Sequence, residues 1–228
     1  MERRLPAEYS GWQEHETAFR RMTAPELIQE IQDGPPDRRL AALSVIDLAE
    51  VDEAIVEDWI RTLPDAEANE LAGAIPVQRA RASCDDDLRW VEVARLGYER
   101  RHLATFLVML FSSLEAMEAR RCPQSEAAWE RVSAWVGDLY DSMAARGESE
   151  VLDDLSLFVF ENYLGREPVF EAFCGLLVRQ EELARKVSTN PSFLLGELDE
   201  SHQRRALMEA EAGGGLPFRD SWNLLQGV

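Results

Sequence analysis

Apolar residues recur every three or four positions along most of the chain, and no stretch keeps the strict alternation of a half-buried strand. The longest example covers residues 103–117, after which Cys122 and Pro123 end the pattern. Residues 129–143 repeat the spacing, and Gly147 supplies a helix end. Short connections between long amphipathic segments favour antiparallel neighbours. The pattern predicts an all-α protein, with helical hairpins packed on an antiparallel helical bundle or array.

Shorter helices, separated by clear stop signals, are expected in the first third of the chain. Residues 8–22 can form the first of them. Thr23 begins the next, because Glu26 three residues later completes a capping box. The turn at residues 33–36 contains glycine and two prolines and ends that helix. Further helical segments are expected at 40–48, at 55–60 and around Leu71.

One segment of this region carries an ordered set of residues: Leu27, Ile28 and Ile31, then Asp33-Gly34-Pro35-Pro36-Asp37-Arg38-Arg39, then Ala41-Ala42-Leu43, then Ile55 and Ile60. On these residues, 23–63 resembles one HEAT-type helical repeat. The resemblance implies stacked helical hairpins and a concave face that binds a peptide. From residue 64 onward the arginine and Ala-Ala-Leu signature is not repeated, so a helical hairpin outside any repeat family is the alternative.

The C-terminal half continues with three more expected helices. Residues 150–164 are apolar on most of the helix circumference, which predicts a helix running through the core. Another helix is expected from Pro168 to Val187, and Asn190-Pro191 opens the next. Gly213-Gly214-Gly215 is expected to be a flexible joint. The apolar tail after it either folds back on its own domain or docks on a partner or a second copy.

These features predict three segments. Residues 1–83 form a helical-hairpin region, 84–211 a helical bundle, and 212–228 a glycine-linked tail. Contact between the first two is expected, which gives one compact unit.

Charge narrows the classes of partner. The chain has 43 acidic and 24 basic residues, a net charge of −19. Nucleic acids and anionic membranes both require a basic face, so neither is expected as a partner. The same charge favours fast capture of a basic protein partner, although an acidic proteome explains it equally well. The longest apolar run, residues 103–111, is half the length of a membrane helix, and the N-terminus lacks a signal peptide's apolar stretch. A cytoplasmic protein is predicted.

The three cysteines, Cys84, Cys122 and Cys174, are widely spaced and include no Cys-x-x-Cys pair. This spacing indicates neither a zinc site nor a redox dithiol. We expect each to be a small buried hydrophobic residue in a reducing cytosol.

Catalytic chemistry has little basis in the sequence. The three histidines accompany no nucleophile motif, and no phosphate-binding glycine loop is present, so we expect no catalytic residues and no cofactor. One metal hypothesis survives. Glu99 and His102 have the Glu-x-x-His spacing of helical di-metal sites, and Asp199 and His202 repeat it with aspartate.

Candidates for partner binding are exposed acids at helix starts and a terminal aromatic residue. They are Asp85, Asp86, Asp87, Glu150, Asp153, Asp154 and Trp222. Helix capping is the competing role of the three consecutive aspartates, because the helix dipole favours negative charge in the first turn. Trp222 lies in the tail, where an exposed aromatic residue would anchor an interface or self-association.

The function expected from the sequence is that of a non-enzymatic acidic helical binding protein. It would capture a basic protein partner, as an immunity protein, an antitoxin or an effector chaperone does. A helical-repeat adaptor that binds a peptide is the alternative. A metal-dependent helical-bundle enzyme is the second alternative.

Overall fold

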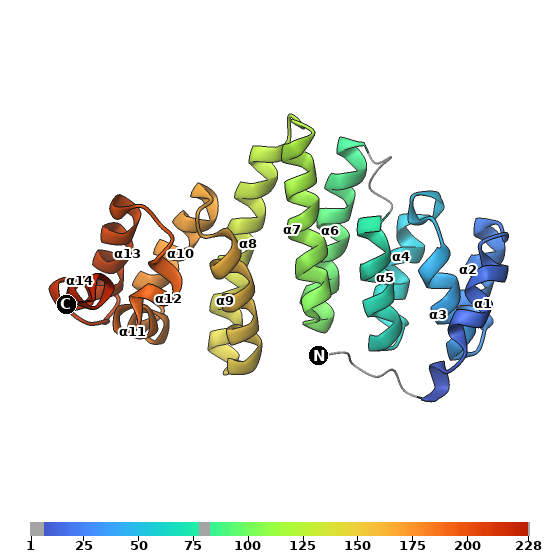
Figure 1. The fold of residues 1–228 in the computed structure, drawn as a ribbon, viewed down its shortest axis with the longest axis horizontal. Coiled ribbons are helices and arrows are strands. Elements are labelled where there is room, and N and C mark those ends of the chain that lie inside the picture. Colours follow the sequence, from blue (N-terminus) through green and yellow to red (C-terminus); the bar gives the residue numbers. More distant parts are fainter. Residues whose placement is uncertain (1–6, 78–82, 228) are drawn as a thin grey trace. The chain divides into compact units, whose positions relative to one another are not determined.

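The computed structural model describes residues 7–77 and 83–227, and every regular element in these two ranges is a helix (Figure 1). The predicted all-α class is confirmed. The chain divides into two compact units, Met1–Ser125 and Glu126–Val228. No helix of the described residues is both long and apolar enough to cross a bilayer.

The first unit holds the shorter helices and one long hairpin. Its elements are η1 (Ala7–Tyr9), α1 (Trp12–Phe19), α2 (Ala24–Asp33), α3 (Pro36–Val45), η2 (Leu48–Glu50), α4 (Glu53–Thr62), α5 (Asp65–Val77), α6 (Cys84–Arg101) and α7 (Ala104–Ala119). The backbone N–H of Thr23 donates to the Glu26 carboxylate over 2.7 Å, so the predicted cap of α2 is present. The helix–turn–helix of α2 and α3 suits a HEAT-type repeat and a plain hairpin alike.

A buried ion pair holds α3 to α5 in this unit. The Glu67 side chain is fully buried and accepts hydrogen bonds from Nε and Nη2 of Arg39 at 3.0 and 2.8 Å. The Tyr9 hydroxyl donates to the same carboxylate over 3.1 Å. Burial, together with this carboxylate, raises the pKa of Tyr9 to about 12. Arg39 also donates to the carbonyl of Gly34, so one arginine joins the α2–α3 turn to α5.

The expectation of three free thiols was wrong for two of them. Cys84 and Cys122 form a disulfide, with their Cα atoms 5.7 Å apart. The reason is the antiparallel hairpin, because the first residue of α6 lies at the same end as the residues following α7. Cys174 is free and buried, and burial raises the pKa of its thiol to about 12. A disulfide is uncommon in a reducing cytosol, where free thiols were expected.

The second unit is built from α8 (Ser125–Arg146), α9 (Ser149–Tyr163), α10 (Glu167–Arg179), α11 (Glu181–Thr189), α12 (Pro191–Leu195), α13 (Glu200–Ala212) and α14 (Phe218–Gln226). The single helix expected from Pro168 to Val187 is two helices, divided at Gln180. No proline or glycine marks the break. Gln180 and Arg179 both donate hydrogen bonds to the Asp141 carboxylate of α8. These tertiary contacts stabilise the break between α10 and α11.

Helix α9 does not run through the core as its apolar circumference suggested. Leu155, Val159 and Phe160 are buried, whereas Leu157 on another face is 42% exposed. The Phe160 ring packs on Phe173 with centroids 4.9 Å apart. One face of α9 therefore belongs to the core, and an apolar position is left at the surface.

The C-terminal tail folds back within its own unit, where α14 packs on α11, α12 and α13. A Cβ at Gly213 would lie 1.8 Å from the carbonyl oxygen of Leu177, and one at Gly215 would lie 2.7 Å from Oγ of Ser188. The backbone N–H of Leu216 donates to that hydroxyl over 2.9 Å. Gly213 and Gly215 are therefore needed for close packing of this turn, whereas the sequence suggested a flexible joint.

Candidate functional site

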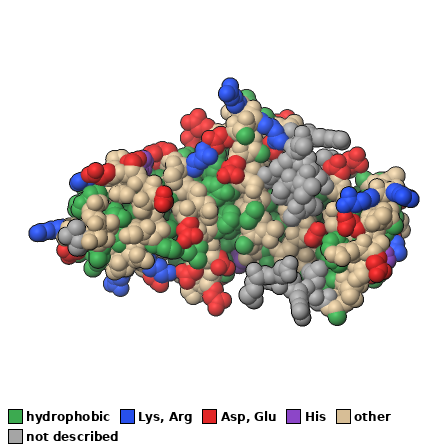
Figure 2. Space-filling view, viewed as in Figure 1, with side chains coloured by type: hydrophobic (Ala, Val, Ile, Leu, Met, Phe, Trp, Pro, Cys, Tyr) green, Lys and Arg blue, Asp and Glu red, His purple; other side chains and the backbone are tan. Residues whose placement is uncertain are grey.

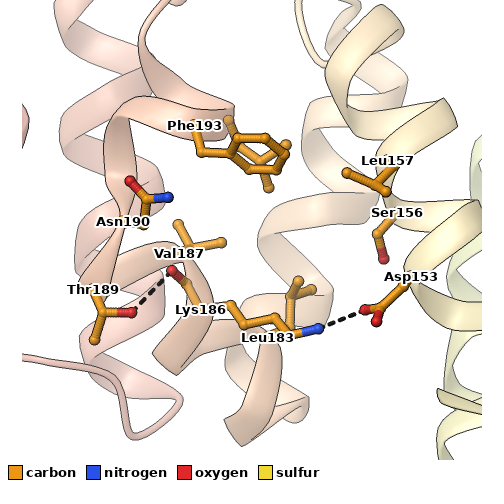
Figure 3. A pocket seen from close by; sticks show the side chains of 10 residues that line it. Asp153, Ser156, Leu157, Leu183, Lys186, Val187, Thr189, Asn190 and Phe193 are labelled. Atoms are coloured by element: carbon orange, nitrogen blue, oxygen red, sulfur yellow. Dashed lines mark hydrogen bonds and ion pairs between the residues drawn. The ribbon is translucent and has the colours of Figure 1, made fainter. Parts of the chain in front are cut away.

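An apolar groove lies between α9, α11 and α12 of the second unit and encloses about 390 Å³. Figure 3 shows Phe193 of α12 and Leu157 of α9 on opposite sides of it. Phe193 is 53% exposed and Leu157 is 42% exposed. Exposed large apolar side chains on both sides of one groove make it the candidate site. The remaining lining residues are Asp153, Ser156, Leu183, Lys186, Val187, Thr189, Asn190 and Leu194.

Hydroxyl groups in the groove are engaged with the backbone of their own helices. Ser156 donates to the carbonyl of Leu152 over 2.7 Å, and Thr189 donates to that of Arg185 over 2.7 Å. A nucleophile would need an adjacent base instead. The groove therefore presents chiefly apolar surface and charged side chains.

The surroundings of the groove are acidic. Residues 126–228 carry 19 acidic and nine basic side chains, a net charge of −10. Helix α9, which forms one wall, contributes Glu150, Asp153, Asp154 and Glu161 and no basic residue. In the space-filling view, acidic side chains are spread among apolar ones on the visible face (Figure 2). The groove is thus an apolar surface in a negative field.

One cation lies in the groove. Lys186, the only lysine of the chain, extends from α11 and its Nζ lies 2.6 Å from Oδ1 of Asp153 (Figure 3). Both side chains are more than half exposed. The hydrogen bond that Lys186 donates to Asp153 raises the pKa of Lys186, which stays charged at neutral pH.

The acidic candidates from the sequence fall into two groups. Glu150, Asp153 and Asp154 are exposed on α9, and Asp153 lines the groove. Asp87 is fully buried and pairs with Arg120 at the end of α7, so it holds the α6–α7 hairpin and cannot face a partner. Asp85 is exposed. The side chain of Asp86 lies outside the described residues.

Trp222 is half-buried on α14. Its ring stacks on Phe218 at 5.8 Å between centroids, and the Arg204 guanidinium of α13 lies 4.5 Å above it. The Trp222 ring therefore has packing and cation–π partners within its own unit.

The two acid-x-x-His pairs lie in different units and have local roles. Glu99 in α6 accepts from Arg95 over 2.6 Å. Asp199 caps α13 by accepting from the backbone N–H of His202. Among residues 7–77 and 83–227, no group of three or more histidine, cysteine or acidic side chains is placed to hold a metal. The metal hypothesis built on Glu99, His102, Asp199 and His202 gains no support from this geometry.

His202 instead joins α13 to α10. Its Nδ1 lies 2.6 Å from the Asp199 carboxylate and its Nε2 lies 3.3 Å from that of Glu167. The ring contacts Phe170 edge-on at 4.5 Å, and the neighbouring Arg205 guanidinium lies over the same phenylalanine. The hydrogen bond to Asp199, followed by that to Glu167, raises the pKa of His202.

A pH-dependent contribution to stability is expected from His202. Because its pKa is higher in the folded state, the stabilisation is fully present below about pH 6.5, the unfolded value, and is lost as pH rises through the folded value. The ring is partly exposed, so the effect should stay below about 1 kcal/mol. Urea unfolding of the natural chain and of His202→Gln across this pH range measures it. Parallel pH profiles of the two proteins would contradict the assignment.

Comparison of the chain with protein-family models, with curated proteins and with solved structures gives no match. The groove between α9, α11 and α12 is therefore the candidate functional site. Sequence reasoning identified its acidic wall but missed its two exposed apolar residues, Leu157 and Phe193. The signal available was the circumference of α9, which carries more apolar side chains than one buried face requires.

Proposed function

We propose that the protein is a non-enzymatic binding protein that captures a basic segment of another protein in the groove between α9, α11 and α12. The observation that carries the proposal is the pairing of exposed apolar side chains, Leu157 and Phe193, with an acidic wall that has no basic residue. An occupant with apolar and cationic side chains matches both features. Roles such as those of an immunity protein, an antitoxin or an effector chaperone require such capture.

The shape of the groove supports a protein segment over a small molecule. Small-molecule sites enclose most of the ligand surface. Here the two most exposed apolar side chains, Leu157 and Phe193, are about half open to solvent, which suits a few side chains of a larger body. Apolar contact would supply affinity, and the net charge of −10 on residues 126–228 would speed association.

Leu157→Ala is expected to weaken binding of a synthetic amphipathic helical peptide, leucine-rich on one face and arginine-rich on the other, by roughly tenfold. The physical reason is the lost apolar contact in the groove. Isothermal titration calorimetry measures the change, and the affinity should also fall as salt is raised.

Leu224→Ala is the matched control. Leu224 is 47% exposed in the same unit but does not line the groove. Leu224→Ala is expected to bind the peptide as the natural chain does. Equal losses for the two variants, or binding that ignores salt, would contradict the proposed function.

A further inference from the structure

We propose that Lys186 is an internal competitor for Asp153, and that a cation of the bound segment displaces it on docking. The inference rests on the proposed function and adds which side chains a bound segment must present to the groove. Its consequence is counterintuitive, because removing the lysine of an ion pair should strengthen binding.

The ion pair between Lys186 and Asp153 is weak enough for an incoming cation to replace the lysine. Lys186 and Asp153 are 55% and 57% exposed, so their attraction is screened by water. Exposed pairs of this kind contribute little stability. Replacing the ammonium group of Lys186 by another cation at Asp153 therefore costs little.

Lys186 has a second acid within reach. Glu182 precedes it by four residues on α11, which is the favourable order for a helical glutamate–lysine pair. The field of Glu182 already acts on Lys186 in the free protein. When a cation of the bound segment pairs with Asp153, the Lys186 side chain can rotate toward Glu182 on its own helix. Its charge then has a carboxylate partner in the complex as well.

The positions of the receiving residues define the occupant. Asp153 and Leu157 are four residues apart on α9 and share one face of that helix. An incoming segment must therefore present a cation and an apolar side chain about one helical turn apart. Glu150 and Asp154 are exposed on the same helix and add further negative charge.

The test measures binding of the arginine-rich amphipathic peptide to the full chain and to four variants. Lys186→Gln is expected to tighten binding about two- to fivefold, because it frees Asp153. Asp153→Asn should weaken binding by a similar factor. In the double variant, Lys186→Gln should no longer tighten binding.

Arg185→Gln is the matched control. Arg185 is the neighbour of Lys186, is exposed and pairs with Glu181, so its loss removes the same charge without freeing Asp153. Tighter binding by Arg185→Gln equal to that by Lys186→Gln would mean a general charge effect and would overturn the inference.

A direct readout comes from lysine labelled with ¹⁵N, because Lys186 is the only lysine and its Nζ signal needs no assignment. The inference predicts that this signal shifts on addition of the peptide, and that the shift is absent in Asp153→Asn. Peptide binding with an unmoved Nζ signal would overturn the inference while leaving the proposed function standing. No binding at all would overturn the proposed function itself.

Discussion

Glu67→Ala is expected to lower the free energy of unfolding by about 3–5 kcal/mol, the largest effect of any single substitution considered. The carboxylate is fully buried and satisfies both Arg39 and the Tyr9 hydroxyl. Its removal leaves a largely buried guanidinium without its counter-charge, which costs more than the pair contributes. Urea unfolding measures the loss, and hydrogen exchange of α3 and α5 assigns it to the first unit.

Glu92→Ala provides the comparison. Glu92 is also a glutamate of the first unit that pairs with an arginine, but it is 48% exposed, and its partner Arg95 keeps a bond to Glu99. A change within about 0.5 kcal/mol is expected there. If Glu67→Ala and Glu92→Ala unfolded at the same urea concentration, the buried pair would not hold α3 to α5.

Removing the Cys84–Cys122 disulfide in a Cys84→Ala/Cys122→Ala variant is expected to lower the free energy of unfolding by about 2–4 kcal/mol. The bond joins residues separated by 38 positions, so its loss frees a long loop in the unfolded chain. The folded hairpin should persist, because α6 and α7 pack along their length. Thermal unfolding with and without a reductant measures the effect.

The double variant controls for other actions of the reductant. It should unfold identically in both conditions, since Cys174 is free and buried. A natural chain that is equally insensitive to reductant would show that the disulfide does not form or does not stabilise.

Helix positions were predictable from the sequence because apolar periodicity and stop signals are local. The cap at Thr23 and the long segments around 103–117 and 129–143 lie where expected. The break at Gln180 was not predictable, since it depends on Asp141 of another helix. The apolar periodicity around Gln180 gives no information about a contact with another helix.

The disulfide was missed although a signal existed. Cys84 precedes the turn at His102–Leu103 by 18 residues and Cys122 follows it by 19, so an antiparallel hairpin brings them to the same end. Antiparallel pairing of the two predicted helices is by itself enough to place the two cysteines close together.

The candidate site was predictable only in part. Glu150, Asp153 and Asp154 were identified because their acidity is visible in the sequence. Leu157 was assigned to the core, since periodicity does not say which of several apolar faces finds a partner. Asp87 was grouped with the exposed acids because its burial depends on Arg120, 33 residues away.

Methyl NMR of the leucine and valine side chains tests the central claim most directly. The arginine-rich amphipathic peptide is titrated into the full chain, with a glutamate-rich counterpart as the comparison. The account predicts that the methyl signals of Leu157, Leu183 and Val187 shift with the basic peptide only, while those of Leu224 stay in place. Shifts centred outside the groove, or equal shifts with the acidic peptide, would contradict it.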